Sequence, residues 1–405
     1  MSRAAPALRP RAEGRRVRDP ALEIRSWGLL AAIVVLSRLL VFEEGALAFL
    51  YLPHAWVQDV PGYLPPPGGF WFQTLLGPWA HWDGYWYLSI AHLGYAGRPL
   101  ATAFFPLYPL LLRALGGTVL AGVLASTVAF VVALGIIHRL AAEVLSPRAA
   151  WFTVLALAFF PTSFYFNAVY PESLFLLLAA GTYLAARRGR LGLAAGLAGL
   201  ASATSIYGLF LAVPLAAALW RRRAPAPLWL WLALVPAGLL GYMATLFEAF
   251  GNPIIFQSVQ SNWGRAFAPL WVTVREAVTQ AVANVPAVVS FPRLFATGQP
   301  TDTASNVWNL LFAAVAVWLL VLAIRRLPWE YWLFSLLVVA VPFSYPSAAV
   351  PLMSVPRLLL AAWPLFLALG DRLAGSPTAL KAYLWLSGAA GLVLVALFTT
   401  AHWVA

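Results

Sequence analysis

Long apolar runs, separated by short polar or basic pieces, follow one another along almost the whole chain. A run of about 20 residues is long enough for a helix to cross a hydrocarbon core about 30 Å thick. In that core only helices and closed barrels satisfy every backbone polar group. The pattern therefore predicts an all-α polytopic membrane protein. We expect about eleven spanning helices, starting near Trp27, Gly117, Ala149, Glu172, Leu191, Tyr207, Pro227, Asn306, Trp329, Pro356 and Leu380.

Two apolar stretches, 149–186 and 191–220, are long enough to be read as single helices. If 191–220 crossed once, the arginine triplet at 221–223 would lie on the opposite side from the other basic loops. We therefore expect breaks at Thr204–Gly208 and at Asn167–Ser173, both at the same membrane face. Short helices that meet at one face leave backbone and polar side chains free to line a cavity.

Composition excludes a water-soluble single core, because 62% of the residues are hydrophobic and 10% are charged. The net charge of +12 comes mainly from the N-terminal segment 1–26 and from loops on one side of the predicted topology. The positive-inside rule places the N-terminus and these loops in the cytoplasm, which explains the charge without a nucleic-acid partner. The loops are 139–148, 187–190, 221–223, 325–326 and 372–381.

The first apolar run, Trp27–Tyr51, is expected to be an uncleaved anchor, because it is long and contains Arg38, whereas the core of a signal peptide is uncharged. Arg38 needs a partner inside the membrane, and Glu43 or Glu44 is the expected one. The absence of cysteine from the sequence excludes disulfides, thiolate nucleophiles and cysteine-bound metals.

The expected domain organisation is a basic cytoplasmic segment, 1–26, followed by one transmembrane domain, 27–405. Two long loops, 53–116 and 251–305, fall on the non-cytoplasmic side, and their length favours a functional role. The first is expected to carry helices that lie in the membrane interface. In the span that starts near Leu191, Gly192, Gly196 and Gly199 indicate close helix packing.

The segment HWDGYWYLSIAHLGY, His81–Tyr95, places Asp83 among large aromatic residues in the first outer loop. A helix starting near His81 would be amphipathic, and Trp82, Trp86 and Tyr87 could form an aromatic belt at headgroup level. A belt does not explain Asp83, because a carboxylate beside lipid is costly unless it has a partner or faces a wet cavity.

Other polar residues are expected at the same outer face, and each has two interpretations. Glu172 follows Pro171, which is typical of a helix start, where an acidic side chain stabilises the helix dipole. Arg357 can extend to the interface, or its guanidinium can bind a lipid phosphate. Residues that could converge with Asp83 at this face are His81, Asn167, Tyr170, Glu172, Tyr345 and Arg357.

The histidines limit the possibilities for a metal site. His81 and His92 are separated by about 16 Å along a helix axis, so one metal cannot bind both from a single helix. His81 and Asp83 could share a metal only if the chain there is extended. We therefore expect no cofactor, and a divalent metal remains the alternative.

The motif HWDGYWYLSIAHLGY, followed by FFPLYPLLLR, resembles the PIG-V family, which contains the second mannosyltransferase of glycosylphosphatidylinositol synthesis, and its bacterial relatives. The likeness continues with FFPTSFYFNAVYPESLFLLLAA (159–180) and SVPRLLLAAWPLF (354–366), in the family's order across most of the chain. The resemblance implies a GT-C glycosyltransferase fold and a polyprenyl-phosphate sugar donor used on the non-cytoplasmic face. It also implies that Asp83 is the catalytic aspartate. Relatives commonly carry Thr-Arg where this chain has Thr204-Ser205, so an arginine is missing there.

The resulting hypothesis is an inverting transfer, with mannose as the expected sugar, to a hydroxyl of a lipid or glycan. Asp83 would act as general base, strengthened by desolvation by its aromatic neighbours. Arg357 and His81 would stabilise the departing phosphate, and Phe104, Phe105 and Tyr108 would line a groove for the donor chain. The expected substrate-binding residues are His81, Trp82, Trp86, Tyr87, Tyr108, Tyr170, Glu172 and Arg357.

A lipid or glycolipid transporter, or flippase, is the alternative from another functional class. It would also have broken helices and few buried charges, but it predicts related halves and ionisable residues near mid-membrane. The halves of this sequence look unrelated, and most polar candidates lie at one face, which favours an enzyme. A non-catalytic family member is the third hypothesis, because of the missing arginine.

Overall fold

The computed structural model describes residues 20–55, 60–64, 68–289 and 304–404, with side chains from residue 27 onward. Within these ranges the chain is helical, without a strand, and has two isolated bridges, Val60 with Tyr63 and Arg265 with Ser347. With η for a 3-10 helix, the elements are α1 (Pro20–Tyr51), α2 (Phe70–Leu75), η1 (Gly77–Ala80), α3 (Asp83–Leu93), η2 (Pro99–Ala103), α4 (Leu107–Ala114), α5 (Val119–Val144), α6 (Pro147–Ala158), η3 (Ser163–Phe166), α7 (Glu172–Arg187), α8 (Leu191–Ser202), η4 (Ile206–Leu211), α9 (Ala212–Arg221), η5 (Ala226–Leu234), α10 (Ala237–Phe250), α11 (Ile255–Ser258), η6 (Val259–Trp263), α12 (Leu270–Val289), α14 (Ser305–Arg326), α15 (Trp329–Ser344), α16 (Val355–Leu358), η7 (Leu359–Ala362), α17 (Pro364–Ala374) and α18 (Pro377–Thr399).

Within the part of the chain that the structure describes, three helices, α5, α14 and α18, are each long and apolar enough to cross a membrane. The pair η5 and α10 meets the same criterion together and is bent by 44° at its break. The chain therefore has the apolar helices of a membrane protein. The full set of crossings expected from the sequence remains a prediction.

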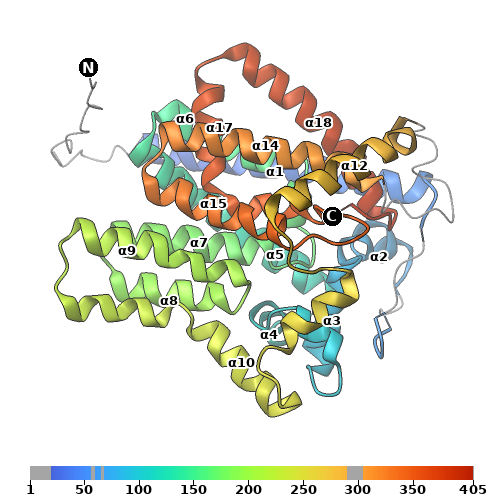
Figure 1. Ribbon diagram of the computed structural model, residues 1–405. Coiled ribbons are helices and arrows are strands. Elements are labelled where there is room, and N and C mark those ends of the chain that lie inside the picture. The colour runs from blue at the N-terminus through green and yellow to red at the C-terminus, as the bar shows by residue number, and fades with distance from the viewer. Residues whose placement is uncertain (1–19, 56–59, 65–67, 290–303, 405) are drawn as a thin grey trace.

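Both predicted breaks are confirmed. The helix α8 ends at Ser202 and η4 starts at Ile206, while α6 ends at Ala158 and α7 starts at Glu172. The helices α8 and α9, on either side of the first break, pack against each other, and α7, α8 and α9 form one layer in Figure 1. The two breaks lie at the same end of the bundle, because Glu172 and Ser205 line one cavity.

Ion pairs join the basic loops at the opposite end. Arg187 contacts Glu143 at 2.7 Å, Arg221 contacts Glu330 at 2.5 Å, and Arg326 contacts Asp371 at 2.7 Å. Each pair connects two loops that the predicted topology assigns to one side. The basic residues Arg3 to Arg25 lie outside the described side chains.

The predicted partner of Arg38 is wrong. The Arg38 guanidinium donates to the carbonyl oxygens of Ala158 at 2.7 Å and Ser163 at 2.9 Å, and to the side chain of Asn167. These carbonyls are available because the chain leaves helical geometry after α6, so their intrahelical donors are missing. Asn167, expected at the outer site, therefore holds Arg38 instead.

The first long loop folds into the protein. Its helix α3 buries Trp86 and Tyr87, which are 5% and 7% exposed. The Trp86 ring stacks on Phe104, with centroids 5.3 Å apart, and Tyr87 packs edge-on against the same ring. The expected aromatic belt is therefore wrong for these two residues, because neighbouring loop segments rather than lipid cover them.

Candidate functional site

Asp83 is the first residue of α3, and the backbone before it is strained. Trp82 has φ of 58°, a value that non-glycine residues rarely adopt. The Tyr170 hydroxyl stabilises this turn by donating to the His81 carbonyl at 3.0 Å and accepting from the Asp83 amide at 3.2 Å. Strained backbone held by surrounding contacts is typical of functional sites.

Arg357 reaches Asp83 from 274 positions further along the chain, with Nη1 2.5 Å from Oδ2. Its Nε lies 3.3 Å from a carboxylate oxygen of Glu172. Its short helix, α16, follows Ser354, another non-glycine residue at positive φ (69°). Thr162 donates to the carbonyl of Pro356 at 2.8 Å and so connects this turn to the break before α7.

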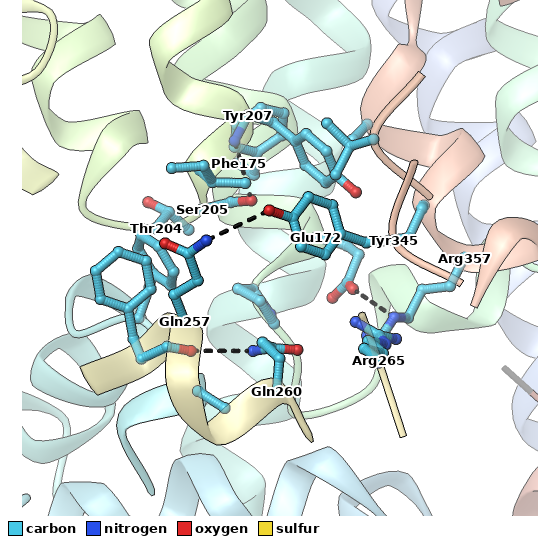
Figure 2. Close-up of a pocket in the computed structure, with 18 of the residues that line it drawn as sticks. Glu172, Phe175, Thr204, Ser205, Tyr207, Gln257, Gln260, Arg265, Tyr345 and Arg357 are labelled. Atoms are coloured by element: carbon cyan, nitrogen blue, oxygen red, sulfur yellow. Dashed lines mark hydrogen bonds and ion pairs between the residues drawn. The ribbon is translucent and has the colours of Figure 1, made fainter. Parts of the chain in front are cut away.

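A cavity of about 430 Å³ has Arg357 in its wall, and Figure 2 shows residues that line it. Glu172 and Arg357 face into it, as does Ser205 from the break between α8 and η4. Glu172 thus combines both of its expected roles, since it starts α7 and also pairs with Arg357. The wall is completed by the first loop, the second loop and α15, through Tyr87, Phe105, Phe256, Gln257, Gln260, Arg265 and Tyr345.

A second cavity, of about 350 Å³, has Asp83 rather than Arg357 in its wall. Its lining is rich in tryptophan: Trp82 and Trp86 come from the first loop, Trp263 from the second, and Trp403 from the C-terminal segment. Asp83 thus has both features expected of a carboxylate at the membrane boundary, a cationic partner and a cavity. The ion pair stands where the two cavities approach each other.

The sequence did not single out Arg265, which lines the first cavity beside Arg357 (Figure 2). Its position depends on backbone pairing between two distant loop segments: Ala348 donates to the Gly264 carbonyl at 3.0 Å, and Ala266 donates to Pro346 at 3.2 Å. Burial and the charge of Arg357 lower the pKa of Arg265. A lone arginine in a loop rich in polar residues carries no sequence signal that would predict this placement.

Three of the expected substrate-binding residues line neither cavity: His81, Tyr108 and Tyr170. His81 is buried, and its Nδ1 lies 3.1 Å from the carbonyl of Phe398. Burial lowers its pKa to about 4, so His81 is neutral at neutral pH and does not supply the expected positive charge. Tyr108 is buried with its hydroxyl 2.9 Å from Ser126, and Phe105 alone of the expected groove residues lines the first cavity.

Tyr170 contributes through its hydrogen bonds and through its ring, whose centroid lies 5.4 Å from the Arg357 guanidinium. Within the described residues no three side chains of the types that bind metals lie together. Comparison with known proteins gave no match to a family model, a curated protein or a solved structure.

Proposed function

We propose that the chain is a membrane glycosyltransferase of GT-C type that moves a sugar from a polyprenyl-phosphate donor to a hydroxyl acceptor. Mannose is the sugar to test first, and a lipid or a glycan would carry the acceptor hydroxyl. The proposal includes about eleven crossings, a cytoplasmic N-terminus, and Asp83 and Arg357 at the non-cytoplasmic face.

One observation carries the proposal: a carboxylate and a guanidinium meet at 2.5 Å between two cavities. Glycosyl transfer from a phosphate donor needs a base for the acceptor and a cation for the leaving group. It also needs room for two substrates, one on each side of the reacting centre. Asp83 borders the tryptophan-rich cavity and Arg357 borders the other, so each group has a cavity of its own for one of the two substrates.

In the proposed reaction the acceptor hydroxyl gives its proton to the Asp83 carboxylate. The acceptor oxygen forms a bond to the anomeric carbon, and the bond from that carbon to the phosphate oxygen breaks. The electron pair of the broken bond goes to the phosphate, whose added charge Arg357 stabilises. Because the attacking and departing oxygens lie on opposite sides of the carbon, the configuration is inverted.

The direct test uses purified protein in lipid nanodiscs with radiolabelled polyprenyl-phosphate mannose and a panel of lipid acceptors. Wild type is expected to form labelled glycolipid, and Asp83→Asn to form it about 10²- to 10⁴-fold more slowly, the usual contribution of a general base. Asp371→Asn is the matched control, because Asp371 pairs with Arg326 at the other end of the bundle. Equal rates for wild type and Asp83→Asn would exclude Asp83 as the base.

The transporter alternative is tested with the same proteins in liposomes. A flippase would move labelled lipid between leaflets without a change in its chemical structure, and this movement would survive Asp83→Asn. A transferase would instead convert donor into polyprenyl phosphate and glycosylated acceptor. Lipid movement without any conversion would therefore replace the proposed function.

A further inference from the structure

The Asp83–Arg357 contact is incompatible with catalysis in its present form. In an inverting displacement the base contacts the attacking oxygen, while the phosphate-binding cation contacts the departing oxygen on the other side of the sugar. The two groups must therefore be separated by the sugar ring. In the structure they are 2.5 Å apart, and the carboxylate of the base is occupied by Arg357. Some event must separate them before the reaction can occur.

We infer that Arg265 and Arg357 form one phosphate-binding site in the first cavity, and that phosphate bound there draws Arg357 away from Asp83 and frees the base. This inference rests on the proposed function for the identity of the reaction. It adds a residue, Arg265, and an order of events: the base is available only when the donor is in place.

The charges in the cavity support the site. Arg265 and Arg357 both line it, and Figure 2 shows their side chains next to each other. Glu172 is the one carboxylate in the described lining, so the wall carries two positive charges and one negative. Among the described residues Arg265 forms no ion pair. Two guanidinium groups side by side repel each other unless an anion binds between them, and phosphate fits their hydrogen-bonding geometry.

The contacts of Arg357 allow it to move between two anions. Nη1 is bonded to Asp83, whereas Nε lies at ion-pair distance from Glu172 on the cavity side. A guanidinium has five N–H donors, and this Nη1 bond is the one hydrogen bond that the described residues show for it. Glu172 can therefore act as a positioning residue that keeps the group at the cavity while Nη1 exchanges Asp83 for phosphate.

The chemistry of the leaving group makes a second arginine useful in the transition state. A polyprenyl-phosphate sugar is a phosphodiester with one negative charge, and the departing polyprenyl phosphate is a monoester that gains a second. Two arginines stabilise the doubly charged leaving group more than the singly charged donor. Their effect on the phosphate therefore grows as the bond to the sugar breaks.

The test measures binding without turnover. Undecaprenyl phosphate, which carries no sugar, is titrated into the full-length protein in nanodiscs, with undecaprenol and inorganic phosphate as parallel probes. Arg265→Gln is expected to weaken undecaprenyl phosphate binding about tenfold or more, because a charge-assisted contact is lost. Arg275→Gln, which alters an exposed arginine of the nearby helix α12, is expected to bind like wild type. Inorganic phosphate should follow the same ranking more weakly, and undecaprenol should not distinguish the variants.

The coupling between phosphate and Asp83 gives a second, less intuitive result. Because Asp83 and phosphate compete for Arg357, Asp83→Asn is expected to bind undecaprenyl phosphate at least about threefold more tightly than wild type. A purely structural role for the ion pair predicts unchanged or weaker binding. Wild-type affinity in both Arg265→Gln and Asp83→Asn would overturn the inference.

Failure of the inference and failure of the proposed function are distinguishable. If wild type transfers labelled mannose but the two variants bind phosphate as wild type does, the function stands and the inference is wrong. If the variants bind as expected but no sugar is transferred from any polyprenyl-phosphate donor, the phosphate site stands and the proposed function is wrong.

Discussion

The Tyr170 hydroxyl connects the two sides of the turn that carries Asp83. It donates to the carbonyl of His81 and accepts from the amide of Asp83, while its ring lies against the guanidinium of Arg357. Two of the groups that define the site are thus oriented by one buried side chain. Such a residue acts through the groups that it positions, and its removal should affect the chemical step more than the fold.

We expect Tyr170→Phe to lower kcat about tenfold and to reduce stability by about 1–3 kcal/mol, because the Asp83 amide loses its partner and the His81 carbonyl loses one of its two donors. Tyr183→Phe is the matched control, since Tyr183 is equally buried and its hydroxyl donates to the Glu330 carbonyl at 2.8 Å, away from the site. Both variants should melt at lower temperature than wild type. An equal loss of kcat per folded molecule in both would exclude a positioning role for Tyr170.

His81 makes stability sensitive to acid. Burial lowers its pKa from 6.5, the value of an exposed histidine, to about 4 in the folded protein. Between these pH values the unfolded chain binds a proton that the folded chain excludes, so the stabilisation is complete above about pH 6.5 and is lost as the pH falls toward 4. A pKa difference of this size corresponds to about 3 kcal/mol.

We expect the melting temperature of His81→Asn to fall less than that of wild type when the pH is lowered from 7 to about 4.5. The asparagine amide can still donate to the Phe398 carbonyl but does not titrate. Thermal melts of the two proteins across this range are the measurement. Parallel curves would mean that other groups cause the acid sensitivity.

At the scale of elements, α8 and α10 pack together through one close approach of their backbones. A Cβ atom on Gly238 of α10 would lie 2.1 Å from the Gly199 carbonyl of α8, whereas a Cβ on Gly241, nearly one turn later, would meet nothing within 4 Å. The small-residue packing predicted for the span starting at Leu191 is therefore confirmed at Gly199. Gly196 faces open space instead.

Alanine at these two positions should have opposite effects. Gly238→Ala must push α10 away from α8 and is expected to cost about 1–3 kcal/mol, the usual range for overpacking. Gly241→Ala should be neutral or stabilising by up to about 1 kcal/mol, because alanine favours helix over glycine. Melting temperatures in nanodiscs compare the pair directly, and similar values would contradict the close packing.

The elements were largely predictable and the contacts between them were not. Pro171 with Glu172 marks the start of α7, and the basic loops indicated where long apolar stretches break. Arg38, in contrast, binds carbonyls that become available only because α6 ends about 120 residues later. Arg265 reaches the cavity because its loop pairs through backbone hydrogen bonds with the loop after α15. The spacing of hydrophobic residues does not predict such pairing. Local patterns thus determine the helices, whereas backbone groups from distant segments complete the buried polar sites.

At the scale of the molecule, the breaks and the basic loops lie at opposite ends of the helix bundle. Asp83, Glu172, Arg265 and Arg357 gather at the end of the breaks, while ion pairs between loops hold the other end. By the positive-inside rule, this charge distribution predicts an orientation in which the basic loops lie in the cytoplasm. The site would then lie at the non-cytoplasmic face. At that face the available donor would be a lipid-linked sugar rather than a soluble nucleotide sugar.

This orientation can be measured without removing native thiols, because the sequence contains no cysteine. Ser261 and Arg190 are both exposed and lie in loops at the two ends of the bundle, so each can be replaced singly by cysteine. We expect a membrane-impermeant maleimide to label Ser261→Cys in intact cells, and to label Arg190→Cys only after the membrane is permeabilised. Both variants should react equally in detergent, which controls for accessibility. The reverse pattern would place Asp83 and its two cavities in the cytoplasm, and a polyprenyl-phosphate donor on the outer face would no longer explain the site.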